Sequence, residues 1–349
     1  MKPAGTFTEG YGQDLAVCNT RLQHGLLWLV LIAIFTAPIY LSEHWLGFIT
    51  IVGISIIAVH GLNILTGYCG QISIGQAAFM GFGGYCAGVL AVKLGLSFWI
   101  ALPCGGLFGA LIGFIFGLPS LRVKGFYLAL VTLAVHFIFN FVIIHTKGLT
   151  GGIYGLVVPA PTIGSITITG TYSWYYVVMI FTVVFTFIAK NLVRTQVGRA
   201  FVAIRDNDIA AESMGINIFR YKLLAFATCS FFAGIAGTLW VFSIGIAEIE
   251  HFHLLDSIWY LGMLIVGGLG SITGGIFGVI FLKLLNELVA YISPVMANAI
   301  PAVEAGVFAA LGLLIYGVVI AVFILFEPRG LNHRLNIFKA SYRVWPFSY

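Results

Sequence analysis

Ten long apolar segments constrain this chain more than any other feature of its sequence. They occupy residues 25–41, 45–65, 75–92, 97–117, 126–144, 173–191, 223–243, 257–269, 275–292 and 306–326. A helix needs about 20 apolar residues to cross the hydrocarbon core of a bilayer. Only 8% of the 349 residues are charged, whereas a soluble domain carries about 25%. Because so few charges cannot cover a water-facing surface, we predict an all-α, polytopic transmembrane helical bundle.

The number of membrane crossings is less sharply set than the fold class. A transmembrane barrel would show short alternating segments instead of these long blocks. Segment 257–269 is too short to cross alone as a straight helix. The sequence therefore predicts about ten spans, with eight or nine if a glycine-broken pair is re-entrant.

Lys and Arg residues predict the orientation of the chain. With the N-terminus placed inside, Lys93 and Lys147 are the outer basic residues and Lys283 falls within a span. The fourteen inner residues are Lys2, Arg21, Arg122, Lys124, Lys190, Arg194, Arg199, Arg205, Arg220, Lys222, Arg329, Arg334, Lys339 and Arg343. Cytoplasmic loops carry an excess of Lys and Arg, so we predict that both termini are cytoplasmic.

This topology divides the chain into three parts. We predict a cytoplasmic N-terminal segment at 1–24, a transmembrane domain at 25–326 and a cytoplasmic C-terminal tail at 327–349. The first 24 residues lack the pattern of a cleavable signal peptide. The most highly charged loop, 192–222, lies on the inner side, and segments 145–172 and 246–256 lie on the outer side.

Two glycine-rich segments echo one another. Residues 67–75 and 267–275 are both rich in glycine and lie between consecutive spans. Repeated broken helices indicate a transport pathway. The polar residues around the first segment suit a path for a polar solute, because backbone freed by a break needs protein or water partners. Close packing of helices through small residues explains the same pattern about equally well.

Catalytic and metal-binding signatures are not found. No lysine follows a P-loop glycine pattern, there is no H-E-x-x-H, and the five cysteines form no Cys-x-x-Cys pair. We therefore expect no enzyme activity, no cofactor and no metal site. His60 and His136 fall within spans, and Lys283 and Glu287 share a helix face. These groups leave an ion-coupled secondary transporter as the alternative function, although structural histidines and a structural ion pair are favoured.

The inner loop contains a predicted helix at 199–214. Ala200, Ala203, Ile204, Ala211 and Met214 form an apolar stripe, and Gly215 is a suitable stop. A short surface helix between two spans suits docking of a cytoplasmic partner. A solvated or lipid-facing linker is an equally acceptable interpretation of the pattern alone.

Three motifs together are specific. The first is Gly67-Tyr-x-Gly70-Gln71-x-Ser73-x-Gly75-x-Ala77-Ala78-Phe79. The second joins Leu118-Pro119-x-Leu121-Arg122-x-x-Gly125-x-Tyr127-Leu128-Ala129 to Leu149-Thr150-Gly151-Gly152-x-x-Gly155-Leu156. The third runs from Gly198-Arg199-Ala200 through Ala203-Ile204-Arg205-Asp206-Asn207 and Ala210-Ala211 to Gly215-Ile216-Asn217 and Tyr221-Lys222. In these motifs, across about residues 45–331, the chain resembles the permease subunits of branched-chain amino acid ABC importers, of the LivM type.

The resemblance implies a role for each motif. It implies a cytoplasmic coupling segment that docks on the ATPase at Gly198, Arg199, Ala203, Arg205, Asp206, Asn207, Ala211 and Gly215. It implies a translocation path at Gly70, Gln71, Ser73, Gly75, Gln76, Thr150, Gly151, Gly152, Gly270 and Ser271. One departure concerns Gln76, where the family often has histidine, and this weakens a substrate assignment based on that position.

The resemblance also implies the partners and the location. ATP would be hydrolysed by separate ATP-binding cassette subunits, and a sister permease of the LivH type would complete the pore. A periplasmic solute-binding protein would deliver a branched-chain amino acid or another small polar solute. Membrane lipid is an expected partner and nucleic acid is not. The expected location is the bacterial inner membrane.

Overall fold

The computed structural model describes residues 21–120, 125–163, 166–168, 170–299, 305–327 and 329–344. The long helices are α2 (Arg21–Tyr40), α3 (Glu43–Leu62), α4 (Gln76–Lys93), α5 (Phe98–Ser120), α6 (Phe126–His145), α8 (Thr171–Arg194), α11 (Ile218–Ile244), α13 (Ile272–Ala299) and α14 (Ala305–Phe326). The shorter ones are η1 (Asn63–Tyr68), α7 (Lys147–Thr150), η2 (Gly152–Tyr154), α9 (Gln196–Asp206), α10 (Asp208–Ser213), η3 (Ile249–Phe252), α12 (Leu254–Gly267) and α15 (Leu331–Val344).

The all-α polytopic fold is confirmed. Each of the ten predicted segments contains a helix. Within the described residues, six helices are long and apolar enough to cross a membrane: Glu43–Tyr68, Phe98–Pro119, Tyr127–His145, Thr171–Arg194, Ile218–Ile244 and Ile272–Ile292. The pair Leu314–Phe326 and Leu331–Phe338, which is bent by 47°, makes a seventh candidate if the two helices form one span. The predicted charges Lys2, Arg122 and Lys124 lie outside the described residues.

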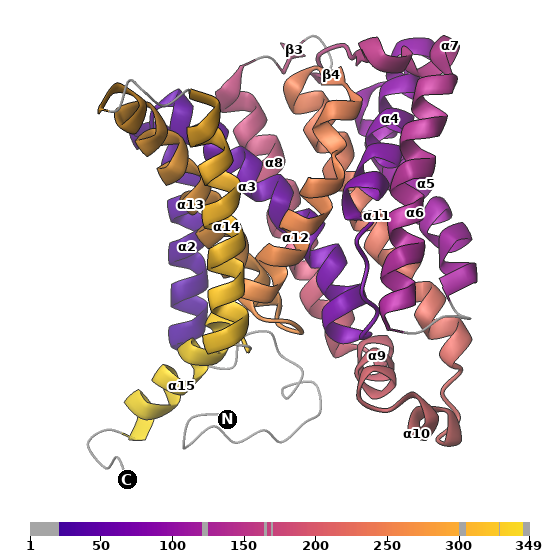
Figure 1. Ribbon diagram of the computed structural model, residues 1–349, viewed down its shortest axis with the longest axis vertical. Coiled ribbons are helices and arrows are strands. Elements are labelled where there is room, and N and C mark those ends of the chain that lie inside the picture. Colours follow the sequence, from indigo (N-terminus) through magenta and orange to yellow (C-terminus); the bar gives the residue numbers. More distant parts are fainter. Residues whose placement is uncertain are drawn as a thin grey trace.

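The predicted inner and outer segments occupy opposite ends of the bundle (Figure 1). Helices α9, α10 and α15 lie at the lower end of the view, whereas α7 and the short strands lie at the upper end. Strands β1 (Leu156–Val157) and β4 (Ile246–Ala247) pair antiparallel and join the two predicted outer segments. Strands β2 (Thr162–Ile163) and β3 (Ile166–Thr167) form a second small ribbon.

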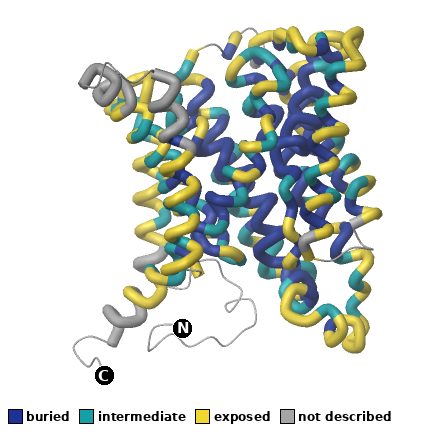
Figure 2. Tube along the Cα trace, in the orientation of Figure 1, coloured by how far each residue is buried: buried dark blue, intermediate teal, exposed yellow. Residues whose placement is uncertain are grey.

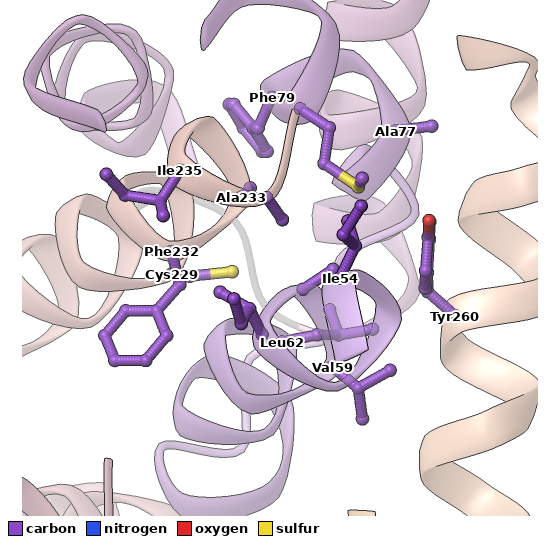
Figure 3. Packing of buried hydrophobic residues seen from close by; sticks show 14 of the residues in the cluster. Ile54, Val59, Leu62, Ala77, Phe79, Cys229, Phe232, Ala233, Ile235 and Tyr260 are labelled. Atoms are coloured by element: carbon purple, nitrogen blue, oxygen red, sulfur yellow. The ribbon is translucent and has the colours of Figure 1, made fainter. Parts of the chain in front are cut away.

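Helices α3, α4 and α11 form the core of the bundle. Figure 2 shows buried residues concentrated on these central helices and exposed residues on the outlying ones. Figure 3 shows apolar side chains from α3, α4, α11 and α12 meeting between the helices, among them Ile54, Phe79, Phe232 and Tyr260. Many large apolar side chains on α2, α5, α6, α13 and α14 are exposed, as expected of surfaces that face lipid or another membrane subunit.

Glycines allow α4, α5 and α11 to approach one another closely. A Cβ atom added at Gly237 of α11 would lie 1.9 Å from the Met80 carbonyl oxygen of α4. One added at Gly83 would lie 2.3 Å from the Gly234 Cα, and one added at Gly109 of α5 would lie 2.5 Å from the Ser230 carbonyl oxygen. Small residues at helix contacts are a usual means of association in lipid. Part of the glycine content therefore serves helix packing.

Helices α4 and α12 start deep inside the bundle. The chain is not helical from Gly70 to Gly75, and α4 begins at Gln76. Gly88, about 18 Å further along α4, packs beside Leu156 and Ala247 in the predicted outer segments. At the other end of this stretch, Gly70 lies against Arg205 of α9. The first turn of α4 therefore lies between the two ends of the bundle.

The first turn of α12 meets that of α4. The backbone N–H of Ala77 donates a hydrogen bond to Ser257 Oγ at 2.9 Å. From there α12 runs to Gly267, and the chain is again non-helical before α13 begins at Ile272. Two discontinuous helices thus have their N-terminal ends together in the interior.

Candidate functional site

Arg205 connects α9 to both glycine-rich segments. Its Nη1 donates a hydrogen bond to the Gly67 carbonyl oxygen at 3.0 Å. A Cβ added at Gly70 would lie 2.9 Å from Arg205 Cγ, and one added at Gly270 would lie 3.0 Å from Nη1. The same guanidinium group holds Asp206 Oδ1 through Nε and Nη2, at 3.0 and 2.9 Å. A single side chain of the charged loop therefore contacts both glycine-rich segments.

Asn63 joins the two glycine-rich segments directly. This buried amide donates from Nδ2 to the Ser271 carbonyl oxygen at 2.9 Å and accepts from the Gly270 N–H at Oδ1 at 3.0 Å. A Cβ added at Gly67 would lie 2.0 Å from Asn63 Oδ1 and 2.5 Å from the Gly270 nitrogen. Segments about 200 residues apart in sequence are thus in contact. Asn63 was not among the predicted site residues, although a polar amide at the end of an apolar span was a signal.

Replacing Asn63 with leucine is expected to destabilise the bundle by about 2–3 kcal/mol. The change leaves the Gly270 N–H and the Ser271 carbonyl without their side-chain partner, and each unsatisfied group costs about 1–3 kcal/mol when buried. Thermal unfolding in detergent measures the effect. Asn191→Leu, at an exposed position near the end of α8, is the matched control. Equal stability of both variants would contradict the assigned bridge.

The charged loop forms two helices, so the prediction of one helix over 199–214 is wrong. Helix α9 ends at Asp206 and α10 begins at Asp208. Asn207 has an extended backbone, with φ −160° and ψ 108°, and its Oδ1 accepts from the Ala210 N–H at 3.1 Å. Asparagine is a favoured N-cap, and it starts a second helix here. The predicted stop is confirmed, because α10 ends at Ser213 and Gly215 has φ +84°.

The remaining predicted coupling residues lie around this helix pair. Gly198 permits a tight entry into α9, since a Cβ there would lie 2.0 Å from the Val193 carbonyl oxygen. Arg199 is exposed and donates from Nη1 to the Arg194 carbonyl oxygen at 3.2 Å. Ala203 is half-buried and Ala211 is buried. These four positions shape the segment and place its exposed side at the end of the bundle.

Large apolar side chains are exposed on and beside α10. Ile209 is 74% exposed and Met214 is 83% exposed, and α10 lies at the lower end of the bundle in Figure 1. Exposed apolar side chains on a protruding segment are typical of a protein contact surface. We call Ile209 and Met214 the α10 tip.

A polar cavity of about 370 Å³ lies beside the break that precedes α4. Its lining residues are Cys69, Gly70, Gln71, Gly125, Leu128, Ile204, Arg205, Asp206, Asn207, Asp208 and Lys222. Predicted path residues and predicted coupling residues therefore share one cavity. We call it the inner cavity. Lys222, at the start of α11, belongs to it but was not singled out as a site residue in the sequence.

The predicted path residues occupy three levels of the bundle. Gly70 and Gln71 lie at the inner cavity, and Gly270 and Ser271 lie beside Asn63. Ser73, Gly75 and Gln76 lie deeper, at the start of α4. Thr150 is the last residue of α7, Gly151 and Gly152 follow it, and α7 lies at the opposite end of the bundle (Figure 1). The predicted path residues at the inner cavity, beside Asn63 and at the start of α4 are thus brought near one another. The three residues at the end of α7 are separate from them.

Several of these residues make structural hydrogen bonds. Gln76 is fully buried, donates to the Ala58 carbonyl oxygen at 2.7 Å and accepts from Cys229 Sγ at 3.3 Å. Thr150 Oγ1 donates to the Ile143 carbonyl oxygen at 2.8 Å and accepts from the Gly152 N–H at 3.2 Å. Both side chains hold neighbouring segments together in this conformation. Their role in lining a path stays a prediction.

Comparison with known proteins decides the family. Residues 45–325 match the family described as "Branched-chain amino acid transport system / permease component". The chain belongs to this family. The Escherichia coli (strain K12) high-affinity branched-chain amino acid transport system permease protein LivM is 31% identical over 298 residues, covering 78% of this chain and 70% of the relative.

Other relatives of this permease extend the comparison. A probable branched-chain amino acid transport permease protein LivM from Methanocaldococcus jannaschii is 25% identical, over 66% of this chain and 67% of the relative. The ribose import permease protein RbsC of Haemophilus influenzae is 25% identical, over 56% of this chain and 62% of the relative. No solved structure matches the chain. The protein is thus a multi-pass inner-membrane permease subunit of the ABC importer class.

Membership of this family displaces the secondary-transporter alternative. The titratable groups that motivated it make local contacts: Glu287 Oε1 lies 2.8 Å from His44 Nε2, so its observed partner is on α3. His60 Nε2 lies 3.1 Å from Thr186 Oγ1 of α8. Within the described part of the chain, the cysteines Cys69, Cys86, Cys104 and Cys229 are free thiols.

Proposed function

We propose that this permease forms half of the translocation path of an ATP-driven importer for branched-chain amino acids or a related small polar solute. In this proposal a sister permease of the LivH type forms the other half, separate ATP-binding cassette subunits hydrolyse ATP, and a periplasmic binding protein delivers the solute. The observation that carries it is the contact of Arg205 with both glycine-rich segments. This contact joins the cytoplasmic loop to the interior of the bundle.

The proposal includes ten crossings with both termini cytoplasmic. Support comes from the helix in each predicted segment and from the placement of the charged loop and α15 at one end (Figure 1). In this topology, residues 69–75 and α4 make one crossing together, and α12 makes the crossing that leads inward from the outer segment. The transmembrane domain then covers residues 25–326, between cytoplasmic segments at 1–24 and 327–349.

The adjoining N-terminal ends of α4 and α12 favour a path for a solute that carries a negative group. A helix N-terminus bears a partial positive charge, and discontinuous helices in transporters direct such ends toward anionic parts of the substrate. The first turns of α4 and α12 meet through the Ala77 N–H and Ser257 Oγ. We place the middle of the path there, near Ser73, Gly75 and Gln76. Its inner end then lies at Gly70, Gln71, Gly270 and Ser271, and the Thr150–Gly152 turn faces the binding protein.

The α10 tip is the proposed ATPase docking surface, and charging it tests the function. The variant Ile209→Glu/Met214→Glu is expected to weaken copurification with the ATPase subunits at least about tenfold, because exposed apolar anchors dominate protein interfaces. ATP-driven uptake in proteoliposomes should fall in parallel.

Ile153→Glu is the matched control for this experiment. Ile153 is 66% exposed but lies in η2 at the opposite end, so its charge should leave copurification of the ATPase unchanged. The proposed function fails if the α10-tip variant transports at the wild-type rate. It also fails if wild-type uptake survives ATP depletion and stops on addition of a protonophore.

A further inference from the structure

Helix α6 carries a row of polar residues on the face that it buries. Thr132, His136 and Asn140 are spaced four residues apart, so they lie along one side of the helix over about 12 Å. Thr132 is 1% exposed and His136 is 2% exposed, whereas Phe137 and Phe141 of the same helix are exposed. Polar side chains at membrane depth are costly and are usually functional. We call Thr132, His136 and Asn140 the α6 stripe.

The inner end of the α6 stripe borders the break before α4. Thr132 Oγ1 accepts a hydrogen bond from the Ile74 N–H at 2.9 Å and donates one to the Ala129 carbonyl oxygen at 3.0 Å. A Cβ added at Gly75 would lie 2.7 Å from the Thr132 carbonyl oxygen. The stripe therefore begins where the proposed path reaches the first turn of α4.

The outer part of the α6 stripe faces the outer half of α4. The rings of Tyr85 and His136 both lie close to that of Phe139, at centroid distances of 6.0 and 6.3 Å. Tyr85 lies about 14 Å along α4 from the start of that helix. Glu248, just before η3, lies within electrostatic range of Tyr85, and His253, just after η3, lies within range of His136. The stripe thus leads from the first turn of α4 toward the outer segment 246–256.

Three polar atoms between α4 and α6 have no hydrogen-bond partner. They are the Tyr85 hydroxyl oxygen, His136 Nδ1 and Asn140 Oδ1, and all three atoms are buried. Tyr85, like His136, is only 2% exposed. Buried polar atoms almost always have a partner, so three such atoms beside one ring point to a shared occupant. Each of the three groups can accept a hydrogen bond, and an occupant that carries N–H or O–H groups matches them.

We propose that the α6 stripe and Tyr85 line the outer half of the translocation path and pass the solute through hydrogen bonds. The N–H or O–H groups of the solute bind Tyr85, His136 and Asn140 in turn as it moves from the outer segments to the first turn of α4. The stripe carries no carboxylate or ammonium group, so it recognises hydrogen-bond donors without trapping an ion. This inference rests on the proposed function and adds lining residues that were not among the predicted path residues.

Tyr85→Phe tests the proposal with the smallest change, because it removes only the hydroxyl group. A hydroxyl without a partner does not stabilise the fold, so the melting temperature should be unchanged or higher. ATP-driven uptake by the assembled transporter in proteoliposomes should fall about three- to tenfold, since one hydrogen bond to the passing solute is lost. Tyr127→Phe, at an exposed position of α6, is the matched control and should transport at the wild-type rate.

Two variants of His136 separate hydrogen bonding from packing. His136→Asn keeps a polar atom near the position of Nδ1, whereas His136→Leu keeps only an apolar side chain. We expect His136→Leu to lose uptake at least about tenfold and His136→Asn to stay within about threefold of the wild type. Rates are compared at equal amounts of folded protein, and Tyr85→Phe carries the test if His136→Leu does not fold.

Water access to the α6 stripe is measured with a membrane-impermeant methanethiosulfonate reagent on the same transporter. A cysteine reacts as the thiolate and is inert in apolar surroundings, so Asn140→Cys and His136→Cys should react at least about tenfold faster than Phe137→Cys. Phe137 is in the same helix, but its exposed side chain faces lipid or another membrane subunit. Labelling is counted above that of the wild type, in which Cys86 and Cys104 are half-buried.

The outcomes separate this proposal from the proposed function. Wild-type uptake by Tyr85→Phe, equal loss of uptake in both His136 variants, or labelling of Asn140→Cys no faster than that of Phe137→Cys would each overturn the lining role. If wild-type uptake depends on ATP in the same vesicles, the importer assignment stands and only the role of the stripe is removed. If wild-type uptake survives ATP depletion, the importer assignment fails whatever the labelling shows.

Discussion

Replacing Arg205 with lysine is expected to reduce ATP-driven uptake at least about tenfold while leaving membrane insertion and ATPase docking intact. Lysine keeps the positive charge but loses the planar fork of arginine. That fork holds the Gly67 carbonyl oxygen and Asp206 at the same time. Hydrogen bonds from charged groups contribute about 1.5–3 kcal/mol each, and 1.4 kcal/mol corresponds to a tenfold effect.

The substitution is expected to impair the transmission of conformational change from the ATPase to the bundle, and not the docking of the permease on the ATPase. The α10 tip carries the exposed apolar side chains, and it does not include Arg205. Copurification of the ATPase should therefore be unchanged when uptake is lost. Arg220→Lys is the control, since Arg220 is an exposed arginine of the same loop. If the Arg205→Lys variant takes up solute at the wild-type rate at equal expression, the contact with the glycine-rich segments does not transmit the conformational change of the ATPase.

The placement of helices could be predicted because it depends on local apolar length. The segment predicted at 223–243 is the interior of α11, and the one predicted at 126–144 nearly coincides with α6. The break at Asn207 was also encoded locally, because an Asn-Asp pair inside a polar helix is a strong N-cap signal. The apolar stripe around it favoured a single helix and led to the wrong prediction.

The convergence of the two glycine-rich segments could not be predicted in the same way. Asn63 binds backbone groups of Gly270 and Ser271, and backbone groups leave no mark in the composition. Their similarity predicted equivalent roles but not contact. Arg205 was predicted as a docking residue, whereas its guanidinium group turns inward to Gly67.

The hydrogen-bond state of each polar side chain likewise depends on neighbouring helices. Gln76 and Gln71 are five residues apart and were predicted as equivalent path residues. Both amide atoms of Gln76 are engaged, by Ala58 and by Cys229, whereas Gln71 Oε1 has no partner. Ser257 and Lys222 escaped prediction because a single Ser or Lys is not distinctive until the fold places it beside a helix start or a cavity.

Replacing Gly237 with alanine is expected to destabilise the bundle by about 3 kcal/mol, the upper part of the usual range for overpacking. The new Cβ would lie 1.9 Å from the Met80 carbonyl oxygen. Backbone cannot rotate away as a side chain can, so α4 and α11 must separate. Separation would also disturb α5, because Gly105 and Gly109 pack on the same face of α11. A decrease in the melting temperature of about 5 °C or more is expected in detergent.

Gly317→Ala is the matched control, because a Cβ at this position in α14 meets no atom within 4 Å. Both changes add one methyl group to a helix and raise its intrinsic propensity by about 1 kcal/mol. Propensity alone therefore predicts that both variants are stabilised, and close packing predicts that only Gly237→Ala is destabilised. Equal melting temperatures of the two variants would mean that α4 and α11 are far enough apart for a Cβ atom at residue 237 to fit between them. The first turn of α4, and with it the interior end of the proposed path, would then be held by Ser257 and Thr132 rather than by helix packing.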